Sequence, residues 1–207
     1  GYKVGPWSFE MDKEEVYQRI ISNITEISRK DRLHAEERYN AVKKYFKEAK
    51  DNIQIFTDRI KDLGSFYLHC RKESIKENMK VIIIDYVQLI HLSGFTGLNR
   101  VSEIELITKT LKNIASELGI TIIILSQLSR EYQKRENKQP ILSDLRDSGS
   151  IEQDSNLVIF LHRQDDYPLM LKDYEKIITV IVAKNRDGRA GSFVLKYQGN
   201  ITKFKEE

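Results

Sequence analysis

The sequence contains very little cysteine, proline and glycine. Its 207 residues include a single cysteine, Cys70, which excludes an internal disulfide and a cysteine-rich zinc site. This sparing use of cysteine fits a reducing compartment, and we expect a cytoplasmic location. The 3 prolines and 10 glycines are too few for a long flexible linker or a low-complexity segment.

Long apolar runs and a marked excess of one charge are also lacking. No stretch approaches the roughly 20 apolar residues that span a bilayer, and there is no signal-peptide pattern, so we expect no membrane partner. The 34 basic and 31 acidic residues give a formal net charge of +3, which excludes a uniformly basic surface but leaves local basic clusters open. With 40% hydrophobic residues, the chain has the composition and length of one sizeable globular domain.

The chain does contain an alternation of predicted strands and helices. Residues 81–84 and 120–125 are continuous apolar runs, which are typical of parallel strands buried on both faces. We expect the first run to be central in the sheet and the second to lie beside it. The order of elements predicts an α/β protein with a mostly parallel sheet, helices on both faces and a C-terminal β-hairpin. Other strands are predicted at residues 2–9, 53–56, 157–161 and 177–183, the hairpin at 193–197 and 201–204, and helices after Asp12 and at 33–49, 65–78 and 102–118.

Polar residues follow the predicted strands at their carboxyl ends, where open α/β sheets bind ligands. Glu10, Asp85 and Gln127 each follow one strand, and Lys184 and Arg186 follow another. Asp85 could hold Mg²⁺, Glu10 could orient or deprotonate an attacking water, and Gln127 could sense a terminal phosphate. Alone, an acid after four aliphatic residues is more often a structural carboxylate. Together, these groups suit nucleotide hydrolysis, in which catalysis is mainly positioning and charge stabilisation.

Five short segments carry a more specific signal than any single residue. The most specific is the thirteen-residue segment 142–154, and the others are 8–11, 84–89, 125–130 and 183–188. In this order, these segments resemble the C-terminal motor domain of DnaB-type replicative DNA helicases, a branch of the RecA-like ATPases. The resemblance runs from Ser8 to Phe204. A recombinase- or clock-type RecA-like ATPase is the alternative among enzymes, and segments 84–89 and 142–154 favour the helicase branch.

The resemblance implies a motor that uses ATP and Mg²⁺ to translocate on single-stranded DNA and unwind duplex DNA. It implies a ring of identical subunits, a hexamer in the family, with a primase or helicase loader as further partners. Glu10 would then be the catalytic glutamate, and Asp85 the Walker B aspartate that handles Mg²⁺. Gln127 would couple the nucleotide state to the DNA-binding loops.

The resemblance also assigns roles to two later segments. Arg146, Asp147 and Gly149 would lie in the loop that contacts the backbone of single-stranded DNA. Lys184 and Arg186 would enter the neighbouring subunit's nucleotide site, with Arg186 as the arginine finger. Without the resemblance, Arg186 could simply flank a tight turn, Arg146 could pair with a nearby aspartate, and Gly149 could be a left-handed loop glycine.

The sequence departs from the family in one respect, because it contains no G-x-x-x-x-G-K-[ST] phosphate loop. Without that loop, the backbone N–H groups and the lysine that cradle phosphates are missing. We therefore expect residues 1–207 to form one RecA-like domain, incomplete at its N-terminus, that alone binds ATP poorly and hydrolyses it negligibly. Three explanations stay open: a piece of a full helicase, one half of a split gene, or a non-catalytic RecA-like module that binds DNA or a helicase.

Overall fold

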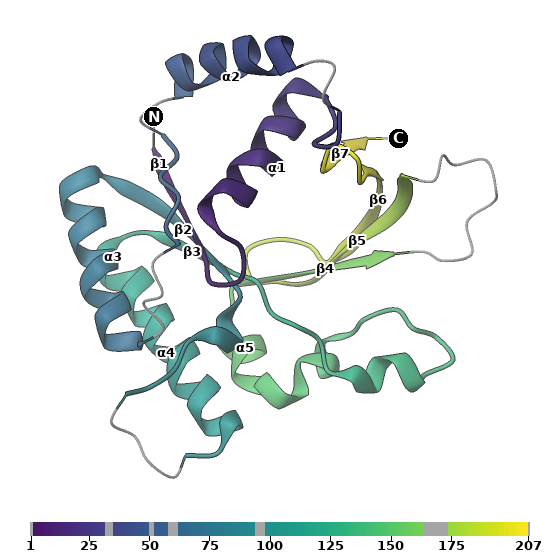
Figure 1. The fold of residues 1–207 in the computed structure, drawn as a ribbon. Coiled ribbons are helices and arrows are strands. Elements are labelled where there is room, and N and C mark those ends of the chain that lie inside the picture. The colour runs from purple at the N-terminus through teal and green to yellow at the C-terminus, as the bar shows by residue number, and fades with distance from the viewer. Residues whose placement is uncertain are drawn as a thin grey trace. The chain divides into compact units, whose positions relative to one another are not determined.

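The computed structural model describes residues 2–31, 35–49, 52–57, 62–93, 98–163 and 174–206. The chain divides into two compact units, which are described separately (Figure 1). The first unit comprises residues 1–13, 49–134 and 143–155, and the second comprises residues 14–48, 135–142 and 156–207. Among the described helices, none is long and apolar enough to cross a membrane.

The first unit is built on a parallel sheet in the order β1-β2-β3, from β1 (Lys3–Ser8), β2 (Met79–Asp85) and β3 (Thr121–Ile124). The expectation that residues 81–84 form the central strand is confirmed. The expectation that both faces of this strand are buried is wrong for one face, because Ile82 and Ile84 are fully buried whereas Val81 and Ile83 are half-buried. Residues 52–57 run parallel to the free edge of β1, where Phe56 N donates to Pro6 O at 2.9 Å. This sheet brings the carboxyl ends of β1, β2 and β3 to one edge.

The expectation that residues 120–125 are buried on both faces is wrong. Ile123 is 47% exposed and Leu125 is 43% exposed. β3 is the last strand of the sheet, and no described strand pairs with its other edge. The apolar run correctly predicted a parallel strand. Its burial depends on the neighbouring strands and helices, which the run of apolar residues does not specify.

Helices pack on the parallel sheet, and the sequence largely predicts where these helices begin and end. Asp62 caps the helix α3 (Leu63–Glu77) by accepting a hydrogen bond from Ser65 N at 2.9 Å. Gly119 ends the helix α4 (Arg100–Leu118) in a left-handed conformation with φ of 60°, which favours glycine. Four shorter helical segments follow the strands: η1 (Val87–Leu89), η2 (Arg130–Lys134), η3 (Leu142–Ser148) and α5 (Gly149–Asp154).

One part of the core of the first unit is an aromatic cluster from β1, residue 56 and α3. Trp7 is 1% exposed, which confirms it as a core residue. Its ring stacks on Phe56 at a centroid distance of 3.9 Å and meets Phe66 edge-on at 5.4 Å. Cys70 of α3 is fully buried, and burial raises the pKa of its thiol to about 12. The thiol is therefore a packing group and not a reactive one.

The second unit contains an antiparallel sheet of four strands in the order β4-β5-β6-β7. The predicted hairpin is confirmed as β6 (Gly191–Gln198) and β7 (Lys203–Glu206). The predicted strands at 157–161 and 177–183 are present as β4 (Leu157–Arg163) and β5 (Glu175–Asn185), but they pair with each other in antiparallel fashion.

Two helices belong mainly to this second unit, α1 (Lys13–Thr25) and α2 (Ala35–Ala49). Asn23 of α1 donates to the carbonyl of Thr202, in the β6–β7 turn, at 2.8 Å. Glu26, just after α1, forms ion pairs with Lys203 and Lys205 of β7 at 2.5 and 3.0 Å. The hairpin is thus fixed to the helix that follows the predicted catalytic glutamate in the sequence.

Candidate functional site

The ends of β1 and β2 are joined by backbone pairing. Ser8 lies opposite Asp85 in the parallel register, and Phe9 N donates to Asp85 O at 3.0 Å. Beyond this contact, the buried Ser8 accepts a hydrogen bond from Met11 N at 3.0 Å through its hydroxyl oxygen. This contact closes a turn around Glu10, whose side chain is exposed. The segment carrying Glu10 is therefore held beside Asp85, as predicted.

The ends of β2 and β3 are joined in the same way. Leu125 N donates to Ile84 O at 2.9 Å, and Val87 N donates to Leu125 O at 3.0 Å. Asp85 is half-buried between these two contacts, whereas Gln127 is exposed two residues beyond Leu125. The segments of Glu10, Asp85 and Gln127 thus meet at one edge of the sheet.

Gln88 is a member of this edge to which the sequence patterns gave no role. Its side-chain Nε2 donates to Ser126 Oγ at 2.9 Å and approaches the carbonyl of Gln127 at 3.4 Å. Its Oε1 is buried and has no hydrogen-bond partner among the described residues. A buried acceptor without a partner is unfavourable, so this oxygen is suited to accept from a bound water or ligand. The only sequence signal for Gln88 was its place within segment 84–89.

The segment after Asp85 is fixed from α4. Arg100 donates to the backbone carbonyls of Gln88 and Ile90 and forms an ion pair with Glu103. Glu103 also accepts a hydrogen bond from Leu92 N at 3.0 Å. Burial by itself would raise the pKa of Glu103, but the hydrogen bonds from Arg100 and Leu92 outweigh it and lower that pKa. An ionised Glu103 keeps Arg100 in place.

The predicted DNA-contacting segment forms η3 and α5. Ser129 N donates to Asp144 O at 3.1 Å, which ties η3 to the chain beyond Gln127. The side chains of Arg146 and Asp147 lie outside the described residues, so their DNA contacts stay predictions. Gly149 begins α5 and does not have a left-handed backbone. The alternative that Gly149 is a left-handed loop glycine is therefore wrong.

Lys184 and Arg186 lie in the second unit, apart from the unit that carries the other predicted site residues. Lys184 is half-buried in β5, and Arg186 is exposed in the turn that follows. Arg186 N donates to Asn156 O at 3.0 Å. A side chain at Gly188 would come within 2.6 Å of Asn185 Nδ2, so the Asn185 side chain would have to shift. Arg186 does flank a turn, and its exposure leaves it accessible to a neighbouring molecule.

Asp85 and Glu10 fit a magnesium ion but not a complete protein cage. No group of three or more His, Cys, Asp or Glu side chains gathers in the part of the chain that the structure describes. Mg²⁺ usually binds through one or two carboxylates and takes its other ligands from waters and phosphates, so Asp85 suits this role. The phosphates of a nucleotide are not matched in the same way, because the sequence contains no phosphate loop.

Comparisons with known proteins agree with these features. The family model for the DnaB-like helicase C terminal domain matches residues 1–206. The chain is 37% identical over 222 residues to the replicative DNA helicase DnaB of Rickettsia felis, and 38% identical over 206 residues to a probable plasmid replicative DNA helicase of Chlamydia trachomatis. These alignments cover 97% and 98% of this chain but only 44% of either relative. The chain thus spans less than half the length of these relatives.

Solved structures give the same result for the fold. One solved ATPase domain, called the reference ATPase domain below, superposes with a TM-score of 0.85 at 32% identity, covering 100% of this chain and 75% of that one. A DnaB-like replicative helicase, whose structure was described with its interactions with primase, gives a TM-score of 0.85 at 31% identity, covering 100% of this chain and 51% of that one. A KaiC-like protein of Pyrococcus horikoshii, at 16% identity and a TM-score of 0.60, shares the fold alone.

Proposed function

The chain belongs to the DnaB-like helicase C-terminal domain family, and we propose that it is the motor domain of a replicative DNA helicase. In this proposal, it couples ATP hydrolysis to translocation on single-stranded DNA and to duplex unwinding. The observation that carries the proposal is the junction of three strand ends, where Phe9 N bonds to Asp85 O and Val87 N bonds to Leu125 O. This backbone pairing supports the proposal, because it brings together the segments to which the family pattern assigns catalytic roles.

Each residue at this edge has a proposed task. The exposed carboxylate of Glu10 orients the attacking water and takes its proton. Asp85 holds Mg²⁺, which when bound neutralises charge on the phosphate oxygens. Gln127 couples the nucleotide bound at the site to segment 142–149, which contacts the DNA backbone. The coupling runs through Ser129 and Asp144. Their backbone hydrogen bond supports this route.

The open edge of β3 supports a further part of the proposal. No described strand pairs with the outer edge of β3, and its apolar Ile123 is exposed; such edges are usually covered or paired. The reference ATPase domain contains more chain than this one, since only 75% of it is covered. We infer that an additional parallel strand pairs with β3 and ends in the phosphate loop. That loop would then lie at the edge that carries Asp85.

Assembly into a ring is part of the same proposal. The exposed Arg186, with Lys184, would complete the nucleotide site of a neighbouring subunit. A head-to-tail contact of this kind is heterologous and closes into a ring. Without the missing segment, we expect a monomer or weak oligomer at micromolar concentration. A primase or helicase loader as partner, and a cytoplasmic location, follow only from the proposed role in replication.

The test is to restore the missing segment. The chain and a fusion carrying the strand, phosphate loop and helix of the reference ATPase domain ahead of residue 1 are assayed with Mg²⁺, ATP and single-stranded DNA. We expect negligible hydrolysis by the chain, hydrolysis by the fusion, and its loss in Glu10→Gln. Glu36→Gln, which changes an exposed glutamate on α2, is the matched control. A folded but inactive fusion contradicts the proposal, and turnover by the chain alone contradicts the need for the loop.

The second candidate is a non-catalytic RecA-like module that binds DNA or a helicase. The observation that favours it is the absence of a phosphate loop from the sequence. The two candidates differ in one result, because such a module would bind single-stranded DNA without hydrolysing ATP even in the restored fusion.

A further inference from the structure

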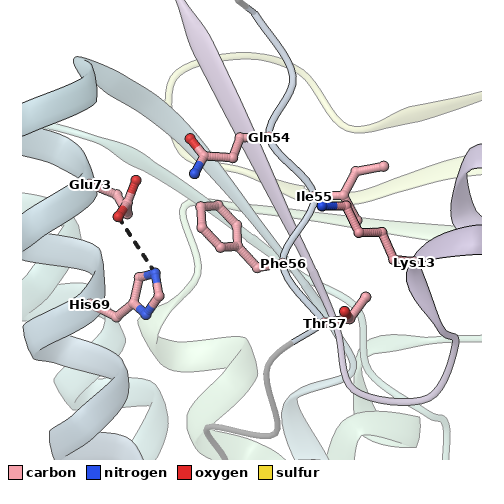
Figure 2. Close-up of a pocket in the computed structure, with 7 residues that line it drawn as sticks. All are labelled: Lys13, Gln54, Ile55, Phe56, Thr57, His69 and Glu73. Carbon is pink, nitrogen blue, oxygen red and sulfur yellow. Dashed lines mark ion pairs between the residues drawn. The ribbon is translucent and has the colours of Figure 1, made fainter.

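A hollow of about 340 Å³ lies in the first unit between α3, residues 54–57 and the start of α1. None of the residues that line it belongs to the proposed catalytic or DNA-binding set. Figure 2 shows that Gln54 and Phe56 point toward α3, whereas Ile55 and Thr57 lie on the side of Lys13. The half of the hollow that faces α3 is therefore lined by Gln54, Phe56, His69 and Glu73.

Glu73 is the unusual group in this half. The residue is only 6% exposed, yet it carries an ionisable carboxyl group. Within the described residues, the one polar contact of its carboxylate is with His69, whose Nε2 lies 3.7 Å from Glu73 Oε1 (Figure 2). That distance is too long for a hydrogen bond. The carboxylate oxygens open onto the hollow and accept no hydrogen bond from the described residues, so Glu73 is suited to accept donors from a ligand.

Aromatic rings form the wall beside Glu73. Phe56 lines the hollow and is backed by Trp7, which stacks on it at 3.9 Å. His69 meets both rings edge-on, at 5.1 Å from Phe56 and 5.5 Å from Trp7. The faces of aromatic rings attract cations, and the carboxylate repels phosphates and other anions. Although Lys13 lines the other side of the same hollow, the carboxylate and the ring of this half favour a cation that also donates hydrogen bonds.

We propose that this hollow binds the guanidinium group of an arginine side chain presented by a partner protein. A guanidinium is planar, can donate two parallel hydrogen bonds to the two oxygens of Glu73, and packs against an aromatic ring, whereas an ammonium is a compact, strongly hydrated charge. The volume is at the lower end of the range of about 300–1,000 Å³ for ligand pockets. It suits one inserted side chain with its adjoining peptide group. The amide of Gln54 supplies an acceptor for the remaining donors.

The chain contains its own reporter for this site. Trp7 is the only tryptophan of the 207 residues, and it lies directly behind Phe56. The indole N–H of Trp7 therefore gives a single NMR signal next to the hollow. We would titrate the whole chain with N-acetyl-arginine amide and, separately, with N-acetyl-citrulline amide, which has nearly the same shape but no charge. We expect a saturable shift of the indole signal with arginine and at least tenfold weaker binding of citrulline.

Two variants separate the site from general electrostatic attraction. Glu73→Gln should weaken arginine binding at least tenfold, whereas Glu105→Gln, at an exposed position on α4, should leave it unchanged. If Glu73→Gln fails to fold, nuclear Overhauser contacts between the arginine side chain and the rings of Trp7 and Phe56 in the native chain decide the question. Equal binding of citrulline, arginine binding that survives Glu73→Gln in a folded protein, or absence of these contacts would overturn the proposal. ATP hydrolysis is not measured, so these outcomes are independent of the proposed helicase function.

Discussion

The strands β2 and β3 have similar sequences and different surroundings. Both contain a run of isoleucines, and they pair in register, with Val81 opposite Thr121 and Ile84 opposite Ile124. On one face Ile84 is fully buried and its partner Ile124 is half-buried, and on the other face Ile83 is half-buried and its partner Ile123 is 47% exposed. The difference arises because β2 has a strand on each side and β3 has one on only one side among the described residues. An apolar run therefore indicates that the side chains of a strand can be buried. The neighbouring strands determine how far they are buried.

The largest expected effect is a difference in stability between alanine substitutions of a fully buried isoleucine in β2 and an exposed one in β3. Ile84→Ala removes a fully buried side chain and should lower the free energy of unfolding by about 2–5 kcal/mol. Ile123→Ala removes a half-exposed one and should cost less than about 1.5 kcal/mol. Urea unfolding of both variants measures the difference. Equal costs would mean that Ile123 is covered in solution.

A second prediction sharpens the comparison through the proposed additional strand. When the fusion with the segment of the reference ATPase domain covers the free edge of β3, Ile123 should become half-buried, as its partner Ile83 is with a strand on each side. The cost of Ile123→Ala should then rise by about 1 kcal/mol, while the cost of Ile84→Ala stays the same. Urea unfolding of the fusion and its two variants gives the result. An unchanged cost at Ile123 would place the added strand elsewhere.

A third prediction concerns the link between β2 and β3 beyond their ends. Gln88 donates from Nε2 to Ser126 Oγ, and Gln88→Glu keeps the shape but removes this donor. The loss of one hydrogen bond should cost about 1 kcal/mol and speed amide hydrogen exchange in residues 125–129. Gln139→Glu, at an exposed position in the second unit, is the control. Unchanged exchange in this segment would show that backbone pairing alone holds it.

The smallest expected effect is a pH dependence at the N-terminus of α3, the helix that packs on Trp7. Hydrogen bonds from the Ser65 backbone and the Ser93 side chain lower the pKa of Asp62 from 3.8 to about 2. A lowered carboxyl pKa in the folded state contributes stability above about pH 4, and that contribution is lost as the pH falls toward 2. Asp62→Asn retains a capping side chain but does not titrate there. Thermal melts of both proteins between pH 5 and 2 should therefore converge at the acidic end. Parallel curves would contradict the shifted pKa.

Much of the fold could be predicted because its signals are local. The left-handed conformation at Gly119, the boundaries of α4 and the β6–β7 hairpin each depend on a few adjacent residues. The antiparallel pairing of β4 with β5 was not predicted, because the direction of a strand depends on its partner and not on its own apolar run. The exposure of β3 was missed for the same reason.

The candidate site was predicted in part. The placement of Glu10, Asp85 and Gln127 at one edge could be predicted because parallel strands bring their carboxyl ends together. Gln88 was missed because its strand ends at Asp85 and the turn of η1 carries its side chain to Ser126, 38 residues away. No local sequence pattern predicts that the Gln88 side chain contacts Ser126.

The sequence by itself determined the identity of the family, the order of strands and helices, and which polar residues follow which strand. These properties are encoded in short segments whose chemistry needs no distant partner to be recognised. Only the tertiary structure decided that Ile123 stays half-exposed, that Gln88 reaches Ser126, and that the carboxylate of Glu73 lies beside aromatic rings. Each of these outcomes depends on contacts between residues far apart in the chain, and such contacts exist only once the whole unit has packed.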